Sequence, residues 1–439
     1  AVDATGATPA VQIAAPAVSQ TSTYVVGISG KVVFLWEGIS PTATQQVGKL
    51  STWTSAGGLH QVTLKSNAAS GFNASTDGTK IMFSANADTT GSTGDVLGAN
   101  VDGTSPATLV TGVDIASGNC TPLFGFAGGV NPVVATCASA PPDGGTPVAN
   151  VTSYSTAWAA TPLTYVGLNF WSADAAGDKL LLANAAGLEV TAIDGGAPTV
   201  IDTKSIEGGF GYLTKDGTNA LYSTSAGDLY SATTATVPVV TTLEASGVKY
   251  FRALAPDDKH IVYSSTLDAQ QFGSDLYLQS TTTAGKTDLV TTTKGALFGL
   301  LSTDDFTTDS KYALYIDNVD TSTFTGDLYS IAVGGTTGTK ITTNEWLNLA
   351  ATGSKVVYND NCQGCGTNSS GAVIGTADIK AVDVSAAMPT PTTLQTTADP
   401  QIYMSAPKDR VIFTFSQNVS GDDGGVLANG NGLWSIAVP

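Results

Sequence analysis

The chain has 439 residues, of which 12% are charged, and its formal net charge is −18. A mean hydropathy of +0.12 excludes a disordered chain. The acidic balance excludes a nucleic-acid binder, which needs a basic footprint, and an anionic membrane surface would repel the chain. No apolar run approaches the roughly 18 residues of a membrane-spanning helix. The 49 glycines indicate a β-rich protein with many tight turns.

Residues 1–21 are rich in Ala, Pro and Thr and belong to no repeat. We interpret them as a mature N-terminus left after processing, or as a tether to a lipid or protein anchor upstream of Ala1. Both interpretations predict a location outside the cytoplasm: extracellular, periplasmic or at the cell surface.

From Ser22 onward, residues 22–439 repeat one pattern: a tight turn, an apolar strand, a loop and a second strand. In the clearest copy, Ala255–Tyr277, Pro256 and Asp257 favour a turn, and His260–Ser264 has the β-branched and aromatic content of a strand. We count nine such units, whose apolar strands are expected at Lys31–Leu35, Ile81–Ser84, the Cys120–Cys137 hairpin, Leu180–Leu182, Leu221–Ser223, His260–Ser264, Ala313–Tyr315, Val356–Tyr358 and Val411–Phe413.

The repeat period of roughly 40–55 residues is close to that of propeller blades, and no amphipathic helical segment separates the units. A four-stranded sheet buries little surface alone, whereas a radial arrangement of sheets covers both faces of each. The sequence therefore predicts an all-β fold: a single β-propeller of four-stranded antiparallel blades, with eight or nine blades.

The motif of the sixth unit, Ala255–Ser265 followed by Asp275-Leu276-Tyr277, resembles the repeat of TolB-type β-propellers, which occur in periplasmic and secreted bacterial proteins. Units two, five, seven and nine carry parts of the motif, and units one, three and four depart from it. The resemblance implies the fold. It does not fix an activity, because the family includes protein-interaction scaffolds as well as propeller domains attached to peptidases or lyases.

Two disulfides are expected from the four cysteines. Cys120 and Cys137 stand at the two ends of a predicted hairpin that turns at Gly128-Gly129, so folding brings them side by side. Cys362 and Cys365 form a C-x-x-C, which can be a redox motif, half a zinc site or a local disulfide. We expect a disulfide that staples a loop, because the stretch is rich in Asn, Gly and Ser.

Histidine and aspartate offer little sign of catalysis. His60 and His260 occupy repeat positions that hold other residues elsewhere, so structural roles are expected for both. A first set of aspartates recurs in the inter-strand turns, where the side chain caps the backbone, and a second set recurs at one strand position. The first set is Asp77, Asp216, Asp257, Asp309 and Asp409, and the second is Asp228, Asp275, Asp327 and Asp378.

Two acidic loops, at Asp304-Asp305 and Asp422-Asp423, interrupt the repeat. Clustered carboxylates can hold Ca²⁺, but neither loop has the spacing of a known calcium motif, and solvated acids are the expectation. The chain has no phosphate-binding loop, no G-x-S-x-G and no H-E-x-x-H. We therefore expect no catalytic residues and no cofactor.

The function that this pattern predicts is non-enzymatic: an extracytoplasmic propeller that serves as a protein-binding scaffold or as a component of a surface assembly. Insertions such as Asp360–Gly375 would decorate its loop face. The alternative is a secreted hydrolase or lyase acting on glycans, which needs two carboxyl groups about 5–9.5 Å apart in one cleft.

The last unit ends at Pro439, one strand short of the others. Soluble proteins avoid an unpaired sheet edge, and Ala10–Ala14 has the length of a short strand. We therefore expect this segment either to pair with the C-terminal strand as a latch, or to pair with a neighbouring molecule as a donor strand.

Overall fold

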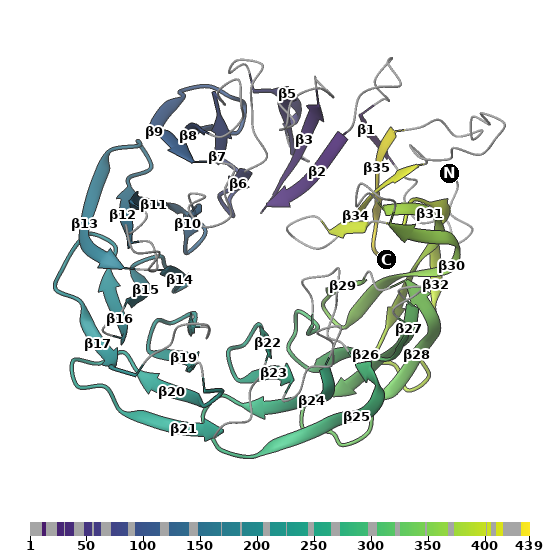
Figure 1. Ribbon diagram of the computed structural model, residues 1–439. Helices are drawn as coiled ribbons and strands as arrows, with labels where there is room; N and C mark the ends of the chain where they lie inside the picture. The colour runs from purple at the N-terminus through teal and green to yellow at the C-terminus, as the bar shows by residue number, and fades with distance from the viewer. Residues whose placement is uncertain are drawn as a thin grey trace. The chain divides into compact units, whose positions relative to one another are not determined.

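The computed structural model describes residues 11–14, 24–29, 31–38, 48–54, 57–62, 72–86, 93–114, 123–139, 148–167, 169–184, 187–204, 211–224, 226–244, 250–264, 273–296, 305–320, 325–346, 349–367, 373–400, 402–404, 410–415 and 432–439. These residues form β-strands joined by turns (Figure 1). None of them lies in a helix that could cross a membrane.

The chain divides into two compact units: an N-terminal unit, Ala17–Thr242, and a C-terminal unit, which combines Ala1–Pro16 with Leu243–Pro439. In the described part of the chain the strands assemble into nine antiparallel sheets, which matches the nine predicted units. Eight sheets have four strands and one has three. Units one and four, in which the repeat motif is weakest, are complete four-stranded sheets.

The N-terminal unit contains five sheets. In each one, neighbouring strands are consecutive in the sequence, as expected for strands joined by tight turns. The strands are β2 (Tyr24–Ser29), β3 (Val32–Gly38), β4 (Gly48–Thr54) and β5 (Gly58–Gln61); β6 (Phe72–Ala74), β7 (Lys80–Ala85), β8 (Thr93–Asn100) and β9 (Ala107–Asp114); β10 (Leu123–Ala127), β11 (Asn131–Ser139), β12 (Val148–Tyr154) and β13 (Ala160–Gly167); β14 (Asn169–Ala173), β15 (Lys179–Asn184), β16 (Gly187–Ala192) and β17 (Thr199–Asp202); and β18 (Gly211–Leu213), β19 (Asn219–Ser223), β20 (Leu229–Thr233) and β21 (Val240–Glu244), within which the division falls.

The C-terminal unit contains the other four sheets. The three-stranded sheet has an isolated bridge, Phe306 to Ala313, beside its first strand. The strands are β22 (Tyr250–Leu254), β23 (His260–Ser264), β24 (Gly273–Ser280) and β25 (Lys286–Ala296); β26 (Tyr312–Asp320), β27 (Thr325–Ala332) and β28 (Thr339–Trp346); β29 (Leu349–Thr352), β30 (Lys355–Thr367), β31 (Val373–Asp383) and β32 (Thr392–Ala398); and β33 (Ile402–Met404), β34 (Arg410–Phe415) and β35 (Gly432–Ala437) with β1 (Val11–Ala14).

The second strand of each sheet is the centre of the core. On β7, the consecutive residues Ile81, Met82 and Phe83 are at most 1% exposed, so both faces of the strand are covered. Phe83 packs in one cluster with Phe34 of the preceding sheet. Burying a side chain of this size stabilises the fold by about 1.5–3 kcal/mol, which explains why the apolar run after each turn marks the repeat.

The repeated aspartates cap the turn between the first and second strands, as predicted. The Ser75 hydroxyl donates to Asp77 Oδ1 (2.5 Å), and the Thr79 N–H donates to the same oxygen (2.9 Å). Asp216 and Asp309 accept equivalent hydrogen bonds in their turns. Hydrogen bonds from Thr214 and Thr218 hold the pKa of the Asp216 carboxyl below its ordinary value. These carboxylates therefore stabilise the turns by accepting hydrogen bonds within them.

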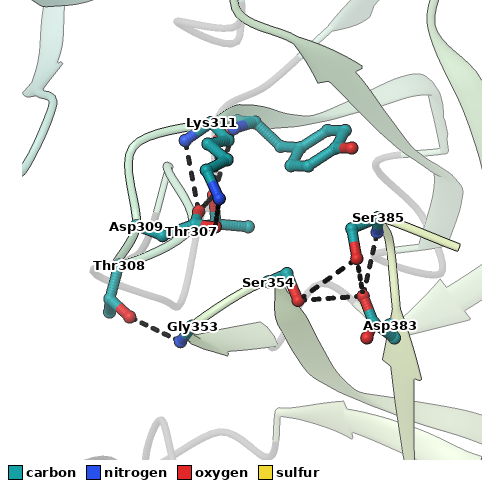
Figure 2. Close-up of polar contacts among 9 residues, drawn as sticks. Thr307, Thr308, Asp309, Lys311, Gly353, Ser354, Asp383 and Ser385 are labelled. Carbon is teal, nitrogen blue, oxygen red and sulfur yellow. Dashed lines mark hydrogen bonds and ion pairs between the residues drawn. The ribbon is translucent and has the colours of Figure 1, made fainter.

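Turns of successive sheets also bond to one another. In the N-terminal unit the Thr76 N–H donates to the Gly129 carbonyl at 2.7 Å, and the Ala175 N–H donates to the Lys215 carbonyl at 2.8 Å. In the C-terminal unit the Gly353 N–H donates to Thr308 Oγ1 at 2.5 Å (Figure 2). These hydrogen bonds between turns thus add polar contacts to the apolar packing between sheets.

The fourth strand of the last sheet comes from the other end of the chain. β1 pairs antiparallel with β35, with Val11 opposite Ser435 and Gln12 opposite Trp434 (Figure 1). This is the pairing expected from the unpaired edge of the last unit, and it is made within one chain. The N-terminal strand therefore belongs to the same sheet as the C-terminal strand.

Candidate binding surface

Among the described residues, the largest departure from the repeat is the hairpin between β30 and β31. β30 has 13 residues and β31 has 11, whereas β19 and β20, which occupy the corresponding positions in another sheet, have five each. We call residues 360–378 the stapled hairpin. The structure describes both of its arms, as far as Thr367 and from Val373.

The stapled hairpin projects beyond the sheet that carries it. The first strand, β29, pairs with β30 only as far as Tyr358, and the fourth strand, β32, pairs with β31 only from Ala377. Beyond these limits the two arms pair with each other, from Gln363 opposite Thr376 to Thr367 opposite Val373. Both edges of the projecting part are therefore free of the sheet's other strands.

A disulfide joins Cys362 to Cys365, with a Cα–Cα distance of 5.8 Å. The predicted bond is present, but its predicted place in a loop was wrong, because both cysteines lie within β30. The strand continues through this segment by means of two irregularities, on either side of Gln363, and Gly364 there has a φ of +64°. Such bulges bend a strand while keeping its pairing.

The base of the stapled hairpin is fixed by charge-assisted contacts. Asp360 lies opposite Asp378 in the strand register, which alone would be repulsive. Lys380 Nζ binds Asp360 Oδ2, while Asp378 accepts hydrogen bonds from Asn361 Nδ2 (3.3 Å) and from the Thr397 N–H (3.1 Å). Each carboxylate thus has its own donors, and the register of the two arms is set before they leave the sheet.

The contact between Asn361 and Asp378 recurs in other sheets. Asn86 Nδ2 donates to Asp95 at 2.8 Å, and Asn318 Nδ2 donates to Asp327 at 3.0 Å. All three asparagines have a φ of 54°, a left-handed conformation that Asn tolerates better than most residues. Sequence reasoning missed these residues. A sequence pattern could have identified them, because in two of the three cases Asn precedes Asp by nine positions.

The arms of the stapled hairpin are polar but uncharged. From 361 to 377 the sequence contains no Asp, Glu, Lys or Arg, on a chain whose net charge is −18. Asn361, Gln363 and Gly364 are exposed, and both cysteines are half-buried. A surface of this kind can be covered by a protein partner without the cost of burying unpaired charges.

Among the described residues, the other side chains singled out in the sequence lie on separate elements. His260 begins β23, and burial lowers the pKa of its imidazole. His60 lies on β5, in the other unit. Asp305 is 5% exposed. Among the described residues no group of three or more His, Cys, Asp or Glu is arranged to hold a metal ion.

Several predicted residues lie outside the described residues: Cys120, Asp304, Asp409, Asp422 and Asp423. The hairpin that should bring Cys120 to Cys137 is present, since β10 pairs with β11 from Leu123 opposite Ala135 to Ala127 opposite Asn131. The Cys120–Cys137 disulfide and a calcium site in either acidic loop therefore stay predictions.

Comparisons with known proteins concern the fold. No protein-family model and no curated protein matches the sequence. Among solved structures, the β-propeller domain of the trilobed protease from Pyrococcus furiosus is similar, with 10% identity and a TM-score of 0.40 over 85% of this chain and 98% of that chain. Repeated four-stranded sheets with this turn motif decide the assignment. The fold is a β-propeller.

Two further similar structures are a putative TolB from Agrobacterium tumefaciens and the tricorn protease. The first has 15% identity and a TM-score of 0.29, over 62% of this chain and 89% of that chain. The second has 11% identity and a TM-score of 0.31. The match covers 88% of this chain but only 46% of the tricorn protease chain. The sheets of this propeller are called blades from here on.

Proposed function

We propose that this propeller is a non-enzymatic, extracytoplasmic protein that binds a protein partner or packs into a surface assembly, and that the stapled hairpin is its contact element. The main support for this proposal is that the hairpin extends beyond its sheet and is nevertheless held in one conformation. It leaves the blade as two paired arms, and a disulfide together with three polar donors at its base limits its freedom.

Restraint matters because a flexible loop loses conformational entropy when it binds, at about 0.5–1.5 kcal/mol for each side chain that becomes ordered. A hairpin already held in one conformation avoids part of that cost. A disulfide between residues three positions apart contributes little to overall stability, so its effect is local. The disulfide also supports an oxidising, extracytoplasmic location.

The test removes the hairpin without disturbing the blade. Asp360 and Asp378 are direct cross-strand partners, so residues 361–377 can be replaced by Asn-Gly, which forms a two-residue hairpin turn. A matched control exists on the neighbouring blade, where Asp317 and Asp327 are also partners and residues 318–326 can be replaced in the same way.

We expect the full-length protein and the control variant to co-purify with the same partner from the native extracellular or envelope fraction, or to show the same assembly mass. The variant that lacks 361–377 should lose both while keeping its unfolding temperature. Equal binding or assembly by both variants would refute the proposed role of the stapled hairpin. If all three proteins remain free monomers, the scaffold function itself is wrong.

The glycan-active alternative gains no supporting observation from the described residues. It stays a hypothesis with a simple assay: incubation of the protein with polysaccharides and measurement of released reducing ends. Activity that disappears when one Asp or Glu is replaced by its amide would establish it in place of the scaffold function.

A further inference from the structure

One buried position in the C-terminal unit breaks the pattern of the other blades. Asn359 lies on β30, in the position that holds Ser84 on β7, Ser223 on β19 and Ser264 on β23, and its exposed fraction is 0%. On β26 the same position holds Ile316, which is 2% exposed, so other blades fill it with a small hydroxyl or an apolar side chain. At Asn359 it holds an amide, which has both a donor and an acceptor to satisfy.

A second buried amide lies in the same row of the sheet. Asn359 is opposite Ile379 of β31, and Ile379 is opposite Gln395 of β32. Residues that are directly opposite in neighbouring strands point to the same face of a sheet. Asn359 and Gln395 therefore share one face, on either side of Ile379, and Gln395 is 7% exposed.

Three polar atoms on this face have no hydrogen-bond partner: Nδ2 and Oδ1 of Asn359, and Oε1 of Gln395. The Gln395 Nε2 group is satisfied, since it donates to the Thr396 carbonyl at 2.9 Å. More than nine in ten buried polar groups in proteins are hydrogen-bonded, and an unsatisfied one is costly. Three on one face of one blade require an explanation.

In the described part of the neighbouring blade, no side chain supplies a partner to these three atoms. Ile379 belongs to a cluster in which Val357 packs against Ile402, Val411 and Phe413 of the last blade. These side chains carry neither donors nor acceptors; Trp434 also packs against the cluster, and its Nε1 donor makes no hydrogen bond to either amide. The row thus has two amide heads facing an apolar wall, with one donor and two acceptors to satisfy.

We propose that Asn359 and Gln395 form an internal water-binding site between the last two blades. Water supplies both kinds of group: it donates to Asn359 Oδ1 and Gln395 Oε1 and accepts from Asn359 Nδ2. Those three bonds match the roughly three that a buried water usually makes. The site lies beneath Asp360, at the base of the stapled hairpin, but the inference does not depend on the hairpin's function.

Crystals of the full-length protein test the site directly. We expect electron density for at least one water within about 2.7–3.2 Å of an Asn359 amide atom and of Gln395 Oε1. In solution, magnetic relaxation dispersion of water nuclei counts long-lived internal waters. That count should fall by about one in Asn359→Leu and in Gln395→Met. Ser264→Ala, at the corresponding position of another blade, should leave it unchanged.

Asn359→Ser provides a second test in case the leucine disturbs packing, because three other blades hold serine at this position. It should fold normally and lose the water bound to the Asn359 head. The inference is overturned if the amide heads contact only carbon atoms or other protein groups in the crystal. A water count that is the same in wild type, Asn359→Ser and Gln395→Met would overturn it equally.

Discussion

In the repeated turn, one position has a positive φ in several blades, but only some of those blades have glycine there. In five blades the fourth residue of the turn between the first and second strands has a φ between 60° and 75°. These residues are Gly78, Gly177, Gly217, Asp258 and Ser310. Only glycine adopts this conformation without a steric penalty, which for other residues is about 1–2 kcal/mol. Asp258 and Ser310 therefore hold strained positions.

Asp258→Gly should raise the free energy of unfolding. Relief of the left-handed strain exceeds the extra entropy of glycine in the unfolded chain, and we expect a net gain of about 0.5 kcal/mol. The hydrogen bonds from the Asp258 N–H to the Ala255 carbonyl and from the Thr281 hydroxyl to the Asp258 carbonyl involve the backbone and remain. Urea unfolding measures the change. Asp258→Ala, which keeps the strain, should show no gain.

His260 predicts a pH dependence. Burial lowers the pKa of His260 below the ordinary value of 6.5; Asp257 opposes this shift, and Lys259 adds a smaller lowering effect. The unfolded chain therefore binds a proton more readily than the folded one, and the stability from neutral His260 is complete above pH 6.5 and declines as the pH falls below it. Asn219 occupies the corresponding position on β19, so His260→Asn is a natural replacement.

The measurement compares the urea midpoints of wild type and His260→Asn at pH 7.5 and 5.5. Wild type should lose more stability than the variant over this interval. Parallel losses would show that His260 does not contribute and that other groups carry the pH dependence.

At the scale of elements, the turns of neighbouring sheets pack so closely that an added side-chain atom would clash. A Cβ added to Gly128 would lie 2.2 Å from the Gly177 nitrogen, and the φ of Gly128 is +57°. Strain and overpacking act together, so Gly128→Ala should destabilise the fold by about 3 kcal/mol. Gly195→Ala is the control, because Gly195 has a φ of +85° but nothing within 4 Å of the added carbon. It should cost only about 1–2 kcal/mol.

Both variants are compared by thermal unfolding. Equal losses would mean that the Gly128 turn moves away from its neighbour at little cost, contrary to close packing of the turns.

The β10–β11 hairpin carries the remaining disulfide prediction. Peptide mapping without reduction should recover Cys120 linked to Cys137, and removing the bond should cost roughly 3 kcal/mol by the entropic account for a loop of this length. Recovery of both thiols in free form would show that the hairpin is held by its strand pairing alone.

The fold could be predicted because each turn motif is followed directly by an apolar strand, as in Asp77 before Ile81–Phe83. Weak motifs still gave complete sheets, because packing between neighbours, rather than the turn alone, stabilises each one. The strand through Cys362–Cys365 could not be predicted. Its Asn and Gly content is typical of loops, and the disulfide, the bulges and the Asp360–Lys380 contact that keep it extended are not local properties of the sequence.

The unpartnered amides were equally invisible in the sequence. Nothing in the stretch around Asn359 marks it as buried on an apolar face, since Ile379, which lies opposite it, packs in a cluster with Ile402 and Phe413 of a different blade. The site therefore emerges only when two segments about 50 residues apart are brought together.

At the scale of the whole chain, the pairing of β1 with β35 predicts that the N-terminus stabilises the C-terminal sheet. Deleting residues 1–16 should lower the free energy of unfolding by about 3 kcal/mol, since each of a few lost strand hydrogen bonds contributes about 1 kcal/mol. A peptide of residues 8–16, added to the truncated protein, should restore part of the loss. Calorimetry with and without the peptide measures both effects.

Two other outcomes have different meanings. Loss of assembly with an unchanged unfolding temperature would show that the segment acts as a donor strand to a neighbouring molecule. No change in either property would show that the segment is only a tether.

The same pairing sets the order in which the protein can be completed during synthesis. Of the described strands, β1 is made before all the others and β35 after them, and Val11 and its partner Ser435 are 424 positions apart, the difference between their residue numbers. Chains fold from the N-terminus as they emerge, so β1 has to wait for β35. Until then the edges of β1 and β34, the two neighbours of β35 in the sheet, lack their partner. A chain truncated before β35 should therefore be open to proteases at two segments that are far apart in the sequence, although only one of them has been altered.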